Sequence, residues 1–422
     1  FMDVLYSVNS YSKFTRPWGS DSLTVQVNWR NIKVGSKAPL QGGYIMFNNS
    51  DRKRDNYMLS GSLMLKGYDW WWHSFTAVDR KTGEKKPFFI EFYLCNPGFG
   101  GKQPVLGQSE YNRNNKRRPS YMMVKVGTWG EDHCQLHRFF GWKDVKIREM
   151  TPFQVSCADC LCSETRLKGS VKVTAKDIAA RPELMCDAGS MEWDLTVSKE
   201  IAFNVGYGAS SLFRKLNAFE MYWHAEGMKT RYSGHIMYNG RRYTVNPDSC
   251  YGYADKNWGK DFTSPWLWLS SNNLTSKITG RKLDNSVFDI GGGRPRVFII
   301  PLPRKLLGAF YYEGREFEFN FSKFWTKPKT QFAFSEDLEF VYWHVRQENK
   351  EYIMDTRVKC RKAEMLFINY EAPSGEKKHN RLWNGGTGTG IIRLYRKTPG
   401  KPEIIDVIQA RNVGCEYGEY DK

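Results

Sequence analysis

Ile236-Met-Tyr-Asn-Gly-Arg-Arg-Tyr-Thr-Val245 is the stretch that decides the fold class. An Asn-Gly pair between two runs of strand-forming residues predicts a β-hairpin with a two-residue turn, because both residues accept the positive φ that this turn requires. The stretch Ala309–Phe321 alternates in the same way after a Glu-Gly turn, and Phe317, Phe319 and Phe321 then share one face. A period of two is typical of a strand with one buried face.

Similar runs occur along most of the chain, as at Phe75–Tyr93 and Gly390–Gln409, whereas convincing helical periodicity is almost absent. Many strands joined by short turns close best as barrels or sandwiches, which leave few exposed edges. Since one barrel uses about 150–200 residues, a chain of 422 residues is long enough for two. We therefore predict an all-β protein with antiparallel barrels over residues 1–205 and 206–422, which meet near the Gly- and Ser-containing stretch Asn204–Asn217.

The composition is that of an ordinary globular protein, with 41% hydrophobic and 26% charged residues, and this excludes disorder as the dominant state. No run approaches the ~18 apolar residues of a membrane-spanning helix, and Phe1–Phe14 lacks the pattern of a secretory signal. The nine cysteines are odd in number and scattered. Reduced thiols and a cytoplasmic location are therefore the expectation.

One group of cysteines raises the question of zinc. Cys157, Cys160 and Cys162 form C-x2-C-x-C, and His133 and His137 precede them. A second C-x2-C pair, which would complete the usual ligand spacing, does not follow, and cysteine often serves as a small buried hydrophobic residue. We predict free thiols and no metal.

The net charge of +18 raises the question of nucleic acid. The charges are spread mostly singly, and no motif typical of nucleic-acid binding occurs. We therefore expect no nucleic-acid partner, although a basic surface with aromatic residues leaves nucleic-acid or glycan binding as an alternative. A basic surface favours acidic partners or membrane headgroups, so peripheral membrane contact is a further hypothesis. The oligomeric state stays open.

The stretch Tyr251–Trp268 carries the densest chemistry. In a strand, Tyr253, Asp255 and Asn257 share one face, and Lys256 points to the other. A phenol and a carboxyl beside an apolar wall can transfer protons, because burial raises the pKa of the carboxyl towards neutrality. The alternative is a tyrosine–aspartate hydrogen bond that only fixes a loop beneath aromatic residues.

The segment Y-A-D-K-N-W-G at 253–259, followed by Phe262 and W-L-W at 266–268, resembles the E-K-N-W-G…F…W-x-W segment of the tocopherol cyclase family. It is also similar to the Y-x-D-x-N-W-G segment of bacterial carotenoid 1,2-hydratases. The resemblance continues weakly at Phe219–Gly227, at Arg381–Tyr395 and at Gly67–Phe75.

The resemblance implies two lipocalin-like β-barrels in tandem, an apolar ligand channel at their junction and chemistry without a cofactor. In this chemistry a proton is added to a carbon–carbon double bond, and water or an internal hydroxyl captures the cation. Tyr253 and Asp255 match the residues to which the hydratases owe acid–base catalysis. A histidine upstream is also implicated in the family, and His224 and Glu226 are the candidates here.

We expect a hydrophobic, unsaturated small-molecule substrate, that is, an isoprenoid, a polyene or a phenolic compound. Tryptophan faces stabilise cations, and His73 is either a core histidine or a further catalytic group. The residues predicted to bind the substrate are Lys256, Asn257, Trp258, Trp266, Trp268, Trp71, Trp72 and His137. The main alternative to an enzyme is a lipocalin-like carrier that binds an apolar ligand without changing it.

Overall fold

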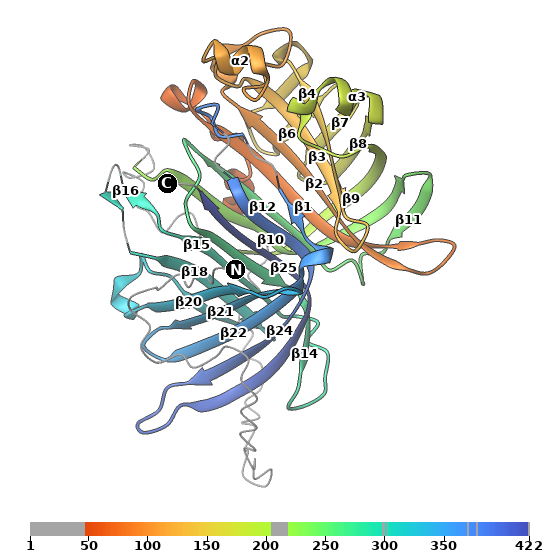
Figure 1. Cartoon of the computed structure of the whole chain (residues 1–422). Coiled ribbons are helices and arrows are strands. Elements are labelled where there is room, and N and C mark those ends of the chain that lie inside the picture. The colour runs from red at the N-terminus through yellow and green to blue at the C-terminus, as the bar shows by residue number, and fades with distance from the viewer. Residues whose placement is uncertain are drawn as a thin grey trace. The chain divides into compact units, whose positions relative to one another are not determined.

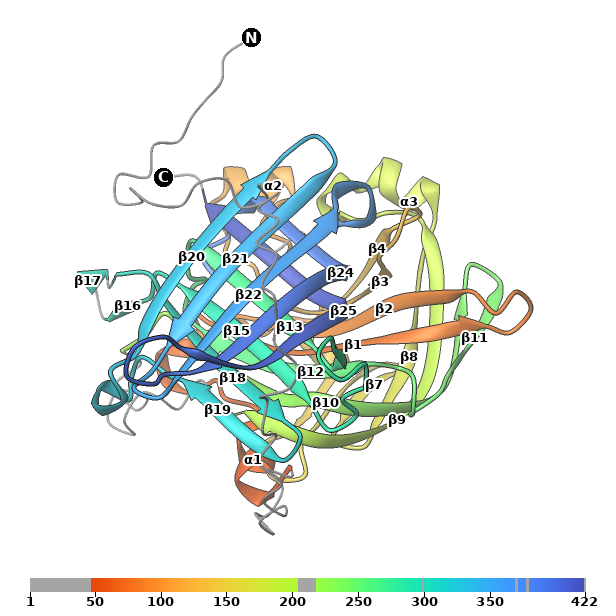
Figure 2. The same cartoon turned by 90° about the horizontal axis from the view of Figure 1, so that it is seen from below.

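The computed structural model describes residues 47–203, 218–297, 300–301, 303–368, 371–376 and 379–420. The predicted junction Asn204–Asn217 lies outside these residues. In the described part of the chain, two large antiparallel sheets account for most of the fold. In Figures 1 and 2 the first sheet runs from orange to green, and the second runs from green through teal to blue. The prediction of an all-β protein with two lipocalin-like, barrel-shaped sheets in tandem is confirmed.

The first sheet has 12 strands among the described residues, and its main path runs β4-β3-β2-β1-β11-β10-β9-β8-β7-β6-β5, with β12 paired to β1 and β10. Its strands are β1 Tyr68–Asp79, β2 Lys85–Cys95, β3 Tyr121–Thr128, β4 Cys134–Phe140, β5 Val145–Arg148, β6 Gln154–Cys157, β7 Cys160–Ser163, β8 Arg166–Val173, β9 Gly189–Phe203, β10 Met221–Tyr238, β11 Arg241–Val245 and β12 Gly252–Gly259.

The second sheet has 11 strands among the described residues, and its main path runs β19-β18-β15-β13-β25-β24-β22-β21-β20. Its strands are β13 Trp266–Ser271, β14 Asn273–Ser276, β15 Val287–Gly293, β18 Lys305–Tyr312, β19 Arg315–Phe319, β20 Lys329–Glu336, β21 Phe340–Glu348, β22 Tyr352–Arg361, β23 Leu366–Phe367, β24 His379–Arg396 and β25 Glu403–Tyr420, and a separate small pair consists of β16 Arg296–Val297 and β17 Ile300–Pro301.

The helices in the described residues are short, and none is long and apolar enough to cross a membrane. The α-helices are α1 Asn49–Arg54, α2 Glu110–Asn114 and α3 Ala175–Ala180, and the 3-10 helices are η2 Gly61–Met64, η3 Pro97–Phe99, η4 Trp142–Asp144, η5 Pro182–Leu184, η7 Phe324–Thr326 and η8 Lys362–Glu364.

The predicted hairpin at Ile236–Val245 is present as β10 and β11, and Tyr238 pairs with Arg241 across the turn. Asn239 and Gly240 have φ values of 45° and 77°, as a two-residue turn of this kind requires. The hairpin also shows that the sheets do not divide at residue 205. β10 pairs with β9, β11 and β12, so the first sheet extends to Gly259, and the Y-A-D-K-N-W-G segment lies in the first sheet rather than the second.

Three apolar clusters pack against these sheets. One contains only residues between 59 and 250, and another contains only residues between 267 and 417, so each is the core of one sheet. The third, here called the inter-sheet cluster, combines both sheets. Its members include Trp72, Tyr93, Trp223 and Tyr253 from the first sheet and Trp268, Val287, Tyr311 and Leu382 from the second.

Candidate active site

β12 is the strand that carries the candidate acid. It is buried along its whole length and lies between β1 and β10. Because side chains alternate along a strand, Tyr253 and Asp255 face the inter-sheet cluster, and Lys256 faces the core of the first sheet. Asn257 follows the face of Asp255, and its side-chain oxygen accepts a hydrogen bond from the Tyr68 hydroxyl at 2.7 Å.

The Asp255 carboxyl is held by two donors. Oδ2 accepts the indole N–H of Trp223 at 2.9 Å and the hydroxyl of Tyr253 at 3.3 Å. Oδ1 has no hydrogen-bond partner among the described residues, and the residue is only 8% exposed. Burial is the main cause that raises the pKa of Asp255 to about 8, and the charges of Glu226 and Glu416 add to the effect. A carboxyl in this state is protonated at neutral pH.

The second sheet contributes a further carboxyl, which the sequence did not reveal. Asp289 on β15 is fully buried, and its Oδ1 accepts the indole N–H of Trp268 at 3.0 Å. Burial and the nearby charge of Asp255 raise its pKa well above the usual value. The two carboxyls come from different sheets and interact within one aromatic environment.

A third acid, Glu416 on β25, lies near this pair. Its Oε2 accepts the indole N–H of Trp266 at 2.8 Å, and burial raises the pKa of Glu416 to about 7. The charge of Glu416 in turn contributes to the raised pKa of Asp255. Neither Asp289 nor Glu416 stands in a motif, so only the pairing of strands brings them to the site.

Aromatic rings surround the acids. The rings of Trp223 and Trp266 meet edge to face with centroids 5.9 Å apart, and Tyr253 lies 5.0 Å from Trp268. Trp72 is paired with Asp255 in the strand register and stacks on Phe89. Indole faces stabilise a cation by about 0.5–2 kcal/mol each when water is excluded. Of the predicted tryptophans, Trp72, Trp266 and Trp268 are therefore brought together around the acids.

The other predicted tryptophans lie on the opposite face of the first sheet. The Lys256 ammonium is 3.8 Å from the ring centroid of Trp71 and 5.7 Å from that of Trp258. Its charge is paired with Asp69, and both side chains are fully buried. The structure does not bring Lys256, Trp71 or Trp258 to the face of Asp255.

His224, Glu226 and His73 also lie on that opposite face. The Lys199 ammonium forms ion pairs with the Glu226 carboxyl at 2.7 Å and with the Asp55 carboxyl at 2.9 Å. Nε2 of His224 lies 3.5 Å from the Asp55 carboxyl, and burial lowers the pKa of His224 to about 4. This buried cluster of Lys199, Asp55, Glu226 and His224 was not predicted. It includes His224 and Glu226, which the sequence analysis named as catalytic candidates beside Asp255.

His73 belongs to a separate set of contacts in the same core. Its Nδ1 is 2.8 Å from the Tyr232 hydroxyl, and that hydroxyl donates to the Tyr253 carbonyl at 2.9 Å. Its Nε2 lies 3.5 Å from the Cys162 sulfur. Burial lowers the pKa of His73 well below the usual value, so the ring is neutral. The ring is thus linked to the backbone of β12 through the Tyr232 hydroxyl, and not to the Asp255 carboxyl.

His137 lies on the same face as Asp255 but far along the sheet. The strand register places Asp255, Trp72, Glu91, Lys125 and His137 in one row across β12, β1, β2, β3 and β4. His137 is thus four strands away from Asp255 along the sheet. Its Nδ1 lies 2.8 Å from the Leu184 carbonyl oxygen, and burial lowers its pKa to about 3.

The described residues hold no group of three or more His, Cys, Asp or Glu side chains placed to bind a metal ion. Cys157 and Cys160 face each other across the β6–β7 turn, while Cys162 contacts His73. His133 lies near the carbonyl oxygens of Gly130 and Ala363 instead.

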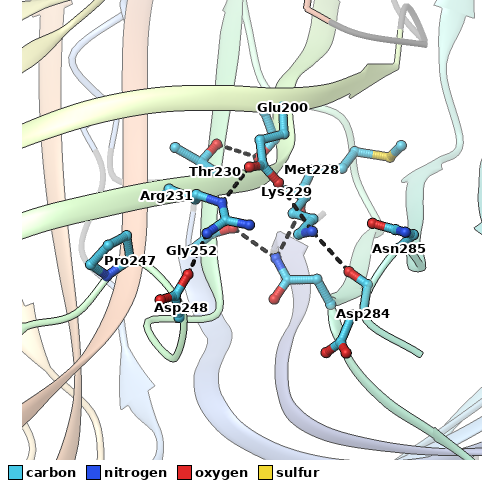
Figure 3. Close-up of polar contacts among 12 residues, drawn as sticks. Glu200, Met228, Lys229, Thr230, Arg231, Pro247, Asp248, Gly252, Asp284 and Asn285 are labelled. Atoms are coloured by element: carbon cyan, nitrogen blue, oxygen red, sulfur yellow. Dashed lines mark hydrogen bonds and ion pairs between the residues drawn. The ribbon is translucent and has the colours of Figure 1, made fainter. Parts of the chain in front are cut away.

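A separate pocket of about 400 Å³ lies beside the start of β12. Figure 3 shows that two cations of its lining are paired: Arg231 binds Asp248 and the neighbouring Glu200, and Lys229 binds Glu200 at 3.0 Å. Its lining consists of Lys229, Thr230, Arg231, Pro247, Asp248, Cys250, Tyr251, Gly252, Asn272, Lys282 and Asp284. This polar lining does not suit the apolar substrate expected from the sequence.

The fold consists of two lipocalin-like sheets, and buried acids lie among aromatic rings from both. This combination defines the structural class of the protein, and comparison with known families identifies its family. The tocopherol cyclase-like family model matches residues 160–419. The chain therefore belongs to the tocopherol cyclase-like family, and the resemblance expected from the sequence is confirmed. No curated protein gives a significant match.

Solved structures with a similar fold share little sequence with this chain. A putative AttH from Nitrosomonas europaea is 13% identical, with a TM-score of 0.44, over 92% of this chain and 100% of that protein. Kievitone hydratase from Nectria haematococca is 10% identical, with a TM-score of 0.43, over 87% and 93%. CghA, solved with Sch210972, is 9% identical, with a TM-score of 0.42, over 85% and 89%.

Proposed function

We propose that this chain is an enzyme of the cyclase or hydratase type that protonates a carbon–carbon double bond of a hydrophobic small molecule and needs no cofactor. The observation that carries the proposal is the buried Asp255 carboxyl, whose pKa of about 8 keeps it protonated at neutral pH. An alkene is protonated only by an acid that is still neutral at the working pH. Membership in the tocopherol cyclase-like family supports the same reaction class.

In the proposed reaction, Asp255 gives its proton to the less substituted carbon of the double bond, and a tertiary cation forms at the other carbon. Oδ1 lacks a hydrogen-bond partner among the described residues, so it is the oxygen available to carry that proton. The rings of Trp72, Trp223 and Trp268 in the inter-sheet cluster stabilise the cation. Water, or a hydroxyl of the substrate, then attacks the cation and loses a proton.

Deuterium incorporation tests this proposal. The full chain is incubated in D2O with 2-prenylphenol, 2-geranylphenol and the acyclic polyene squalene. Cyclisation of 2-prenylphenol gives 2,2-dimethylchroman with one deuterium at C3, and hydration gives a tertiary alcohol with one deuterium. Either product from the wild type, together with its loss in D255N, supports the proposal. Turnover that survives in D255N contradicts it, and binding of the panel without turnover identifies a carrier.

A matched control is available in the second sheet. Asp406 is also a buried aspartate that accepts a tyrosine hydroxyl, from Tyr312 at 2.9 Å, but neither residue belongs to the inter-sheet cluster. D406N therefore removes a comparable carboxyl and a comparable hydrogen bond. We expect D406N to keep the activity of the wild type. A loss of activity in D255N alone would then show that the Asp255 carboxyl acts in the reaction, and not that any buried aspartate is needed for the fold.

A further inference from the structure

We propose that one end of the first sheet docks on an anionic lipid membrane, with its cations on the lipid headgroups and three apolar side chains inserted among them. This end, here called the docking end, consists of residues 61–67, 96–120 and 141–144, and it includes α2 (Figure 1). The proposal goes beyond the proposed reaction, since it names a partner of the protein, and it can be tested without a substrate.

The order of the strands brings the three segments of the docking end together. β1, β2, β3 and β4 are consecutive antiparallel neighbours. The start of β1, the end of β2, the start of β3 and the end of β4 therefore lie at the same end of the sheet. The segment before β1, the connection from β2 to β3 and the segment after β4 must then lie side by side.

Hydrogen bonds join these segments to one another. The side chain of Asn96 accepts the backbone N–H of Gly67 at 2.9 Å and donates to the Pro119 carbonyl oxygen at 2.8 Å. The Ser120 hydroxyl donates to the Asn96 carbonyl oxygen at 3.0 Å and accepts the indole N–H of Trp142 at 2.8 Å. The docking end is thus one connected surface.

The docking end is strongly basic. Its exposed charged side chains are seven cations and two acids, Glu110 and Asp144, which leaves a net charge of +5. The cations are Lys66, Lys102, Arg113, Lys116, Arg117, Arg118 and Lys143. Each Lys or Arg near an anionic bilayer tightens binding about fivefold. The charge of this surface therefore complements that of anionic lipid headgroups.

Large apolar side chains are exposed on the same surface. Leu65 is 47% exposed, Phe99 is 48% exposed and Tyr111 is 66% exposed. Leu65 lies beside the loop of Phe99, because a Cβ on Gly98 would be 2.9 Å from Leu65 Cδ2. Apolar and aromatic side chains next to Lys and Arg are typical of surfaces that enter the headgroup region of a bilayer. Leucine offers no ring on which a base can stack, so the surface suits a membrane better than a single-stranded nucleic acid.

The opposite end of the same sheet is basic without these apolar side chains. The β1–β2 turn carries the exposed Arg80 and Lys81, and the β10–β11 turn carries the exposed Arg241 and Arg242. Neither of these two described turns exposes a large hydrophobic side chain. The opposite end therefore provides a control surface of the same charge sign.

The inter-sheet cluster extends to the docking end. Leu106, within segment 96–120, and Tyr121, at the start of β3, are both members of this cluster. An apolar substrate of the kind proposed above dissolves in a membrane. Docking at this end places the apolar interior next to the phase that holds such a substrate. This consequence rests on the proposed function, whereas the docking itself does not.

Co-sedimentation of the full chain with lipid vesicles tests the role of charge. The vesicles consist of phosphatidylcholine alone, or of equal parts phosphatidylcholine and phosphatidylserine. We expect the wild type to bind the anionic vesicles at least about tenfold more tightly than the neutral ones, and R117E/R118E to bind them at least about 25-fold more weakly than the wild type. Equal binding to both kinds of vesicle overturns the proposal.

R80E/K81E is the matched control, because it changes the net charge by the same amount at the opposite end. It should bind within about threefold of the wild type at about 0.1 M salt, where charges more than about 10 Å from the lipid are screened. An equal loss of binding in R80E/K81E and R117E/R118E would show that only the overall charge matters, and this overturns the proposal.

A second pair of variants tests the apolar side chains. L65S/F99S should bind the anionic vesicles at least about tenfold more weakly than the wild type, because less apolar surface leaves water. L338S is the control, since Leu338 is fully exposed in the β20–β21 turn of the second sheet and should not affect binding. Unchanged binding in L65S/F99S, or an equal loss in L338S, overturns the proposal.

Other partners of the same surface give different results. If the wild type binds mixed-sequence single-stranded RNA and not the anionic vesicles, and R117E/R118E loses the RNA, the surface is a nucleic-acid site and the proposal is wrong. If L65S/F99S does not fold, R117E/R118E still decides, because both arginines are exposed. D255N should bind vesicles as the wild type does, so docking and the acid are tested separately.

Discussion

The indole ring of Trp223 on β10 lies directly against Gly291 on β15, so that a Cβ on this glycine would lie 2.4 Å from ring atom Cζ3. The same indole donates its N–H to Asp255. Gly291 of the second sheet thus limits the position of the Trp223 indole of the first sheet. The position of the Asp255 carboxyl therefore depends on how closely Gly291 and Trp223 pack.

Gly291→Ala should therefore disturb the acid without touching it. The added methyl group must displace the Trp223 ring, and overpacking of this kind costs about 1–3 kcal/mol. We expect lower turnover and a lower free energy of unfolding, measured by urea titration. In the W223A/G291A double variant the two destabilisations should not add, because the ring that the methyl group meets is absent. Strict additivity would show that the two residues do not contact each other.

Asp255→Asn should abolish turnover and also change how stability depends on pH. The pKa of Asp255 rises from 3.8 to about 8 on folding, so between these values the folded state binds more protons and this group makes wild-type stability fall as pH rises. Asparagine does not titrate. The stability of D255N relative to the wild type should therefore increase from about pH 4 to about pH 8 and stay level above it. Urea unfolding at several pH values checks this, and a difference that does not change with pH would contradict the raised pKa.

The activity of the wild type should decline as pH rises through about 8, since only the protonated form of Asp255 can act. Trp223→Phe removes a donor that lowers the pKa of Asp255. The decline should then begin at higher pH, although the lost hydrogen bond costs about 1 kcal/mol of stability. Initial rates across pH 6–10 for both proteins are the measurement. If activity declines at the same pH in both proteins, the titration of Asp255 does not cause the decline.

Lys199→Met should destabilise the first sheet strongly. The ammonium is fully buried between Asp55 and Glu226, and its removal leaves two buried carboxyls without their partner, at a cost of about 3–5 kcal/mol. The matched control is Lys229→Met, whose partly exposed ion pair with Glu200 should contribute about 0–1 kcal/mol. Equal unfolding midpoints in urea for the two variants would show that the buried group adds no stability of its own.

The local parts of this architecture could be predicted from the sequence. The Asn-Gly turn at Asn239 and Gly240 and the alternation of Tyr253, Asp255 and Lys256 depend on neighbours in the chain, and both have the predicted form. Trp71 and His73 likewise lie on one face of β1 and Trp72 on the other, as the alternation of a strand requires.

The partners across strands could not be predicted, because they depend on which strands pair. Asp289 stands alone in an apolar, glycine-rich run, and its proximity to Asp255 results from two sheets that meet. His224 and Glu226 are close to Asp255 through β10 and β12, but the alternation of β10 turns them to the other face. The predicted boundary at residue 205 does not coincide with the boundary between the two sheets, which follows β12. The reason is that β10, β11 and β12 pair with β9 and β1 of the first sheet.

The alternation along β12 also limits which insertions and deletions this chain can accept near Asp255. Asp255 and Lys256 are adjacent in the chain but face different interiors, and a slip of one residue exchanges every side chain between the two faces of a strand. A single insertion or deletion before Asp255 would thus put an ammonium group among the tryptophans and a carboxyl beside Asp69. A change in the length of this strand therefore keeps Asp255 on its face only if it comes in pairs of residues or is absorbed by a β-bulge, as in the irregular pairing of β10 with β12.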